Sequence, residues 1–179
     1  MTQKLSNNMK AIKKVVLALA LLVSVNTFAQ DRPIHEVYSM MMVNFVKYVQ
    51  WPNQASGGEF VIGVVGNNEI YTTLNTWHGG KERSGKTYII KKFNSAADLT
   101  ACDVVYIDRS KSNDFEAISN KVKGKNTLII TDKAGLGEKG SAINFRTIDN
   151  KLKFELNQKA VEASNLKVSS ALSSMAIVI

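Results

Sequence analysis

Few side chains in this sequence have the chemistry that an enzyme needs. The 179 residues contain two histidines, His35 and His78, and a single cysteine, Cys102. Cys102 begins an apolar run, where a cysteine is expected to be a small buried hydrophobic residue rather than a nucleophile. The sequence shows no hydrolase nucleophile elbow, no cluster of zinc-ligand residues and no Ser-His-Asp set. We therefore predict a protein that is not an enzyme, without catalytic or metal-binding residues.

Polar residues that follow the predicted strands are the candidates for binding a small molecule. They come directly after three apolar runs and are Gly66, Asn67, Asp108, Ser110, Thr131 and Asp132. In an open α/β sheet, ligands bind at the carboxyl ends of the strands, near the point where the strand order reverses. If the sheet is of that type, these residues gather along one edge. A small-ligand crevice there is the first alternative hypothesis for function.

Two motifs that resemble nucleotide or phosphoryl sites do not meet the requirements of that chemistry. Gly135, Gly137 and Gly140 match G-x-G-x-x-G, but a dinucleotide site needs the turn to lead into a helix, and residues 141–145 are typical of a strand. The run 104–108 ends in an aspartate, as in a response-regulator receiver, but the first strand is not followed by paired acids. No cofactor is predicted.

Apolar runs that alternate with amphipathic segments indicate an α/β fold. Strands are predicted at 60–65, 87–93, 102–107, 127–131, 142–145 and 151–156. Helices are predicted at 69–77, 115–122, 158–164 and 169–176, with a single helical turn at 95–99 and a last turn at the C-terminus. This alternation predicts one three-layer domain, with a mostly parallel sheet flanked by helices. The short polar turn 147–150 predicts a C-terminal antiparallel hairpin at the edge of the sheet.

The segment 34–50 is predicted to be an amphipathic helix with a broad apolar face, against which the other elements of the domain pack. Its apolar residues recur at steps of three and four, Asp31 is a suitable N-cap, and Pro52 ends the helix because the residue before a proline avoids the α region. We favour a core position for Trp51, where this helix meets the sheet. In the alternative, Trp51, Pro52 and Lys47 form a partner-binding surface, since tryptophan is enriched at binding hot spots.

The N-terminal residues have the pattern of a cleavable export signal. Lysines within 10–14 precede an apolar run of eleven residues at 15–25. A membrane-spanning helix requires about 20 apolar residues, so this run is too short to be an anchor. Small residues up to Ala29 predict cleavage after that residue. The predicted organisation is a signal peptide at 1–29 and one exported domain at 30–179.

The charge of the predicted mature domain is modest. The whole chain has a formal net charge of +8, but four of its lysines lie in residues 1–29, which leaves 19 basic against 15 acidic residues, or +4. Such a charge is ordinary for a secreted domain and gives no reason to expect a nucleic-acid partner. One cysteine cannot form an internal disulfide, so the core has to hold without one.

Six stretches occur in an order and spacing that carry a family resemblance. They are Asn44–Pro52 (NFVKYVQWP), Phe60–Gly66 (FVIGVVG), Cys102–Ile107 (CDVVYI), Ile143–Phe145 (INF), Lys153–Asn157 (KFELN) and Leu166–Leu172 (LKVSSAL). Together they resemble the YfiR/HmsC family of periplasmic regulators over about residues 33–177. No single stretch is specific, but the ordered set is.

The resemblance implies a non-enzymatic inhibitor. Characterised relatives bind the periplasmic sensing part of an inner-membrane diguanylate cyclase and hold it inactive. An outer-membrane lipoprotein can sequester the inhibitor, which raises cyclic di-GMP and favours biofilm. The implied partners are an inner-membrane sensor protein (a diguanylate cyclase, or in an alternative a histidine kinase), an outer-membrane lipoprotein and a second copy in a homodimer. A structural envelope protein is the second alternative.

The resemblance does not extend to one property of the family. Relatives can carry intramolecular disulfides that link their stability to the redox state of the envelope. Cys102 lies where the family often has one cysteine, but this sequence has no second cysteine to pair with it. Redox control by that route is not expected here.

Overall fold

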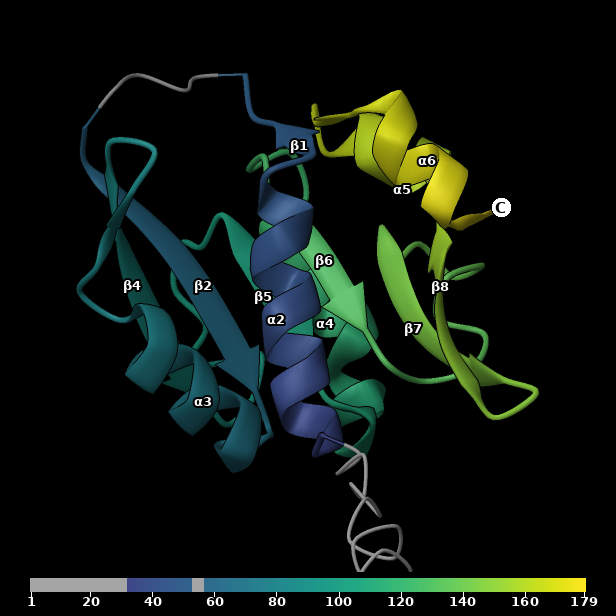
Figure 1. The fold of residues 1–179 in the computed structure, drawn as a ribbon, viewed down its shortest axis with the longest axis horizontal. Coiled ribbons are helices and arrows are strands. Elements are labelled where there is room, and N and C mark those ends of the chain that lie inside the picture. The colour runs from purple at the N-terminus through teal and green to yellow at the C-terminus, as the bar shows by residue number, and fades with distance from the viewer. Residues whose placement is uncertain (1–31, 53–56) are drawn as a thin grey trace, which may run out of the picture. The chain divides into compact units, whose positions relative to one another are not determined.

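The structure analysed is a computed structural model, which describes residues 32–52 and 57–179 (Figure 1). The predicted signal peptide 1–29, its cleavage after Ala29 and the predicted cap Asp31 lie outside the described residues.

An eight-stranded sheet forms the middle of the domain, in the order β10-β8-β7-β6-β5-β2-β4-β3. Five neighbouring strands run parallel: β4 (Lys86–Phe93), β2 (Glu59–Val65), β5 (Val104–Ile107), β6 (Leu128–Thr131) and β7 (Ile143–Ile148). The remaining strands are β8 (Lys151–Leu156), which is antiparallel to β7, β3 (Glu82–Arg83), which is antiparallel to β4, and β10 (Ile177–Val178), which is parallel to β8. The prediction of a mostly parallel sheet is confirmed.

The strand order reverses in the middle of the sheet. From β2 the chain passes through α3 (Asn68–His78) to β4 on one side of β2, and then crosses to β5 on the other side. The connections that leave the carboxyl ends of β2 and β5 therefore run toward opposite edges of the sheet. In sheets of this kind that point leaves a crevice, because neither connection covers it.

Helices cover both faces of the sheet, which gives the three layers that the sequence predicts (Figure 1). The helices α2 (Ile34–Val46) and α3 share one face, and their buried side chains belong to one hydrophobic cluster with those of α5 (Gln158–Ala163) and α6 (Ser170–Met175). The helix α4 (Phe115–Val122) packs on the other face in a second cluster. Since both faces are covered, β5 and β6 are buried along their whole length and read as unbroken apolar runs.

The first helix ends earlier than predicted. We expected it to continue to Pro52, but α2 ends at Val46, and the strand β1 (Val49–Gln50) follows. β1 forms an antiparallel two-stranded sheet with β9 (Lys167–Val168), and the Ser169 N–H donates to the Tyr48 carbonyl at 2.9 Å. Pairing with a segment more than a hundred residues away therefore outweighs the local helical pattern.

Two side chains of α2 also face differently from the predicted pattern. Ser39 is polar, yet it is buried, and its hydroxyl donates to the carbonyl of His35 at 2.7 Å. That hydrogen bond satisfies the hydroxyl and allows it to lie inside the protein. Ile34 is apolar, yet as the first residue of the helix it is 54% exposed.

The C-terminal part of the chain confirms the hairpin and corrects two smaller predictions. β7 and β8 are joined at Asp149 and Asn150, both of which have the left-handed φ that a two-residue type I′ turn needs. The predicted last turn of helix is wrong, because Ile177 and Val178 form β10 against β8 instead. Residues 95–99 form a non-helical turn, in which the Asp98 carboxylate accepts hydrogen bonds from nearby backbone N–H groups.

Aromatic packing attaches α2 to the sheet. The ring of Tyr38 stacks on that of Phe145, with centroids 4.2 Å apart and planes within 4°. Phe45, two turns further along the helix, packs at 5.8 Å from Phe145 and 4.8 Å from Phe154. Such pairs add to the free energy that burial of the rings supplies. The helix is thereby held along the β7–β8 hairpin.

We expect Phe45→Ala to lower the free energy of unfolding by about 3–5 kcal/mol, because it removes a buried ring (4% exposed) and leaves a cavity between α2 and the hairpin. Urea unfolding followed by circular dichroism measures this change. Met40→Ala is the matched control, since Met40 lies on the same helix but is 40% exposed, and its effect should stay within about 0.5 kcal/mol. Equal losses in the two variants would contradict the assigned orientation of α2.

Candidate functional site

A crevice of about 370 Å³ opens at the carboxyl ends of β2, β5 and β6. Its walls come from the start of α2, the turn between β2 and α3, the residues that follow β5 and β6, and Thr147 of β7. The crevice therefore lies where the strand order reverses, as in other open α/β sheets.

Asn67 links the ends of β2 and β5. Its Oδ1 accepts a hydrogen bond from the Ile70 N–H at 2.9 Å and caps α3, while its Nδ2 donates to Asp108 Oδ2 at 2.9 Å. Asp108 Oδ1 accepts from the backbone N–H of Ser110 at 2.9 Å and from its hydroxyl at 2.5 Å. Burial pushes the pKa of Asp108 upward, but the hydrogen bonds from Ser110 and Asn67 outweigh burial and hold this pKa below its ordinary value.

Asp132 behaves differently from Asp108, although both follow a central strand. Its side chain is only 4% exposed, and its one hydrogen bond comes from Arg109 Nε to Oδ2 at 2.9 Å. The side chain of Arg109 is 65% exposed. Burial raises the pKa of Asp132 above its ordinary value and outweighs the attraction of Arg109. The fold therefore holds a carboxylate where its ionised form is poorly solvated.

Two tyrosines bring hydroxyl groups to the same crevice. Tyr38 comes from α2 and Tyr106 from β5, with ring centroids 6.4 Å apart. Burial is the main cause that raises the pKa of both phenols, so both hydroxyls are protonated at neutral pH. On the exposed side, His35 Nδ1 lies 3.4 Å from Glu69 Oε2.

The structure brings three of the sequence-predicted crevice residues together in the lining: Asn67, Asp108 and Asp132. Ser110 is outside the lining and acts on the crevice through its two hydrogen bonds to Asp108. Gly66 is also outside it. Gly66 has a φ of +93°, and a Cβ there would lie 2.4 Å from Lys111 Cγ, so both the turn and the close approach of that lysine require glycine.

Thr131 does not face the crevice. It is fully buried, and its Oγ1 lies 2.7 Å from Asn144 Oδ1 and 2.9 Å from Ser141 Oγ. Asn144 Nδ2 in turn donates to Glu155, which is also paired with Arg146. This buried polar network joins β6 to the β7–β8 hairpin, so the role of Thr131 is structural.

Sequence reasoning missed several residues of the crevice, above all Tyr38, Tyr106 and Arg109. Both tyrosines lie within apolar periodic patterns. Such patterns predict that the ring is buried but not where the hydroxyl group lies. Arg109 could have been predicted from the sequence, since it directly follows Asp108 at the end of a predicted strand.

The predicted partner-binding residues lie at the other end of α2, around β1. Trp51 is 8% exposed and packs edge-on against Phe60, with ring centroids 5.1 Å apart. This burial favours the core position over direct contact with a partner. Pro52 and Lys47 are exposed, and Lys47 Nζ donates to Asn44 Oδ1 at 2.8 Å.

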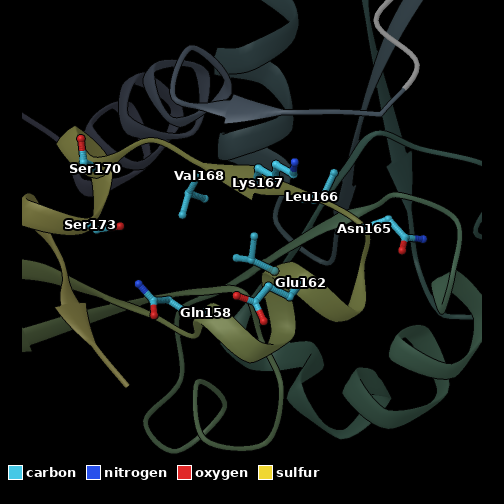
Figure 2. A pocket seen from close by; sticks show the side chains of 9 residues that line it. Gln158, Glu162, Asn165, Leu166, Lys167, Val168, Ser170 and Ser173 are labelled. Atoms are coloured by element: carbon cyan, nitrogen blue, oxygen red, sulfur yellow. The ribbon is translucent and has the colours of Figure 1, made fainter.

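A groove of about 770 Å³ lies beside this region and is lined by residues of α5, β9 and α6 (Figure 2). Figure 2 shows Gln158 and Glu162 of α5 on one side, and Lys167 and Val168 of β9 with the start of α6 on the other. Because β9 pairs with β1, the groove and the predicted partner-binding residues are parts of one region. We refer to β1, β9 and the groove as the C-terminal surface.

Several other features of the described part of the chain bear on function. Burial raises the pKa of the Cys102 thiol to about 11, which keeps it protonated and unreactive at neutral pH. Among the described residues, no group of three or more His, Cys, Asp or Glu is placed to hold a metal ion. No helix in residues 32–52 or 57–179 is long and apolar enough to cross a membrane.

Fold and surfaces together define an open-sheet α/β domain with a strand-end crevice and a separate C-terminal groove. The chain belongs to the YfiR/HmsC-like family, because the sequence profile of that family matches residues 35–177. The family resemblance is thus confirmed. No curated protein sequence matches the chain.

One solved structure supports the fold. It is the crystal structure of a conserved domain protein from Vibrio cholerae O1 biovar El Tor strain N16961, with a TM-score of 0.50 and 13% sequence identity. The match covers 80% of this chain and 59% of that one. At this identity the similarity shows the fold alone.

The Asp108 carboxylate gives a testable dependence of stability on pH. Its pKa is lowered by folding, so its contribution to stability is complete above the pKa of the unfolded chain, about 3.9, and is lost as the pH falls through the folded value. We expect Asp108→Asn to lower the free energy of unfolding by about 1–2 kcal/mol at pH 7, because an amide there loses the hydrogen bond from Asn67.

Urea unfolding at pH 7 and at pH 3 tests this, and the difference between variant and parent should shrink at the lower pH. Asp149→Asn is the control, since Asp149 is exposed in the hairpin turn and has a left-handed φ that asparagine tolerates. A deficit of equal size at both pH values would show that the ionised form of Asp108 is not what the fold stabilises.

Proposed function

We propose that this chain is a non-enzymatic periplasmic regulator that inhibits an inner-membrane signalling protein by binding its periplasmic sensing part. The family match over residues 35–177 carries this proposal, because the YfiR/HmsC-like family is one of periplasmic regulators. The signalling protein is, in this proposal, a diguanylate cyclase, so that release of the inhibitor raises cyclic di-GMP and favours biofilm. Residues 1–29 serve as the export signal, cleaved after Ala29.

The physical requirement for such an inhibitor is modest. A binding protein shifts a two-state sensor if it binds the inactive state more tightly than the active one, and no catalytic group is involved. A domain whose core spans both faces of an eight-stranded sheet is suited to this role, because a preorganised surface loses little conformational entropy on binding.

We place the contact with the sensor on the C-terminal surface. Exposed Lys47 and Pro52 border β1, and the groove adjoins them through β9. In this arrangement Trp51 holds β1 in place from inside the core, and its neighbours make the contact.

In-cell crosslinking of the tagged mature protein tests the proposal. Recovery of one inner-membrane protein with a periplasmic segment supports it, and the output domain of that protein distinguishes a diguanylate cyclase from a histidine kinase. Recovery of an outer-membrane lipoprotein as well would identify the sequestering partner. Recovery of no membrane protein at native expression would reject the proposal.

We expect Lys47→Glu to reduce the crosslinked yield of the sensor about tenfold, since it reverses a charge at the edge of the C-terminal surface. Lys92→Glu is the control, because Lys92 is an exposed residue of β4 and its substitution makes the same change of charge away from that surface. Unfolding curves should be alike for both variants. If Lys92→Glu reduces the yield as strongly as Lys47→Glu, the contact does not lie where we place it.

A further inference from the structure

Two unsatisfied polar atoms lie at the strand-end crevice. Within residues 32–52 and 57–179, four buried side-chain polar atoms have no hydrogen-bond partner, and two of them, Tyr106 Oη and Asp132 Oδ1, belong to residues that line this one crevice. Tyr106 is completely buried and Asp132 is 6% exposed. Burial and then the charge of Asp132 raise the pKa of Tyr106, so the two side chains face the same space, yet neither atom has a partner within hydrogen-bond distance. Buried polar groups in proteins are nearly always paired, so two such atoms facing one crevice indicate a missing partner.

The other carboxylates of the crevice already have structural roles. Asp108 is satisfied by Asn67 and Ser110, and Glu69 lies in the first turn of α3, where a negative charge is favourable. Asp132 has no such explanation. Its single hydrogen bond comes from an exposed arginine and leaves the second oxygen unpaired.

The charges of the lining select the class of ligand. Glu69, Asp108 and Asp132 are acidic and only Arg109 is a permanent cation, so an anion would meet net repulsion there. A cation that donates to Asp132 Oδ1 would relieve the cost of that buried carboxylate. The Tyr106 hydroxyl can accept a second hydrogen bond from the same group. Ile34 and Ile70 add apolar walls suited to methylene groups.

We propose that the crevice binds a small aliphatic ammonium compound, with Asp132 and Tyr106 as its buried polar contacts. The ammonium group donates to Asp132 Oδ1 and Tyr106 Oη, and the methylene chain runs between the isoleucines toward the solvent. A cavity of about 370 Å³ is within the range of small-molecule sites. This site is separate from the C-terminal surface, and binding to it does not require that the chain act as an inhibitor.

Thermal unfolding of the purified mature protein with 1,4-diaminobutane tests the proposal. A ligand that binds only the folded state raises the melting temperature, and we expect a rise of about 4 °C at about 10 mM diamine. 1,4-Butanediol, with the same chain and no charge, should cause no rise, and sodium chloride at equal ionic strength controls for screening. No rise with the diamine, or an equal rise with the diol, would overturn the proposal.

Two variants locate the site. Tyr106→Phe removes only an unpaired hydroxyl, so the variant should fold, melt at or above the parent temperature and lose most of the shift caused by the diamine. Asp132→Asn should lose the shift as well. Tyr88→Phe, which alters another buried tyrosine on β4, should keep it. A shift that survives in Tyr106→Phe and Asp132→Asn would show that the amine binds elsewhere.

Discussion

The packing of α2 against the sheet is the interaction on which the rest of the structure depends. The helix covers the centre of one face and is held by Tyr38 stacked on Phe145 and by Phe45 between Phe145 and Phe154. These rings connect the first element of the domain to the β7–β8 hairpin near its end. Without that contact the parallel strands would lose the cover that allows them to be apolar on both faces.

The same helix joins the two candidate sites. Its first turns supply Ile34, His35 and Tyr38 to the strand-end crevice, and its last residue leads into β1 and the C-terminal surface (Figure 1). A shift of the helix along the sheet would therefore change both ends together. The crevice and the C-terminal surface are thus built at opposite ends of one helix, and its packing on the sheet fixes the geometry of both.

The sequence predicted the centre of the sheet well because β2, β5 and β6 are buried on both faces and read as apolar runs. It failed where pairing between distant segments decides the structure, as at β1, which leaves the helical pattern to pair with β9, and at β10, which joins β8. For the crevice, Asn67, Asp108 and Asp132 were found because strand ends converge in this topology. Tyr38 and Tyr106 were missed because a hydrophobic pattern predicts a buried ring but not the position of its hydroxyl.

The level of cyclic di-GMP in the cell is the most direct test of the proposal that this chain holds a membrane signalling protein inactive by contact. We expect deletion of the chain to raise the cyclic di-GMP level and the wild-type chain to restore the low level. A chain confined to the cytoplasm by removal of residues 1–29 should not restore it. An unchanged cyclic di-GMP level after deletion, or full restoration by the cytoplasmic form, would show that the chain does not act as a periplasmic inhibitor.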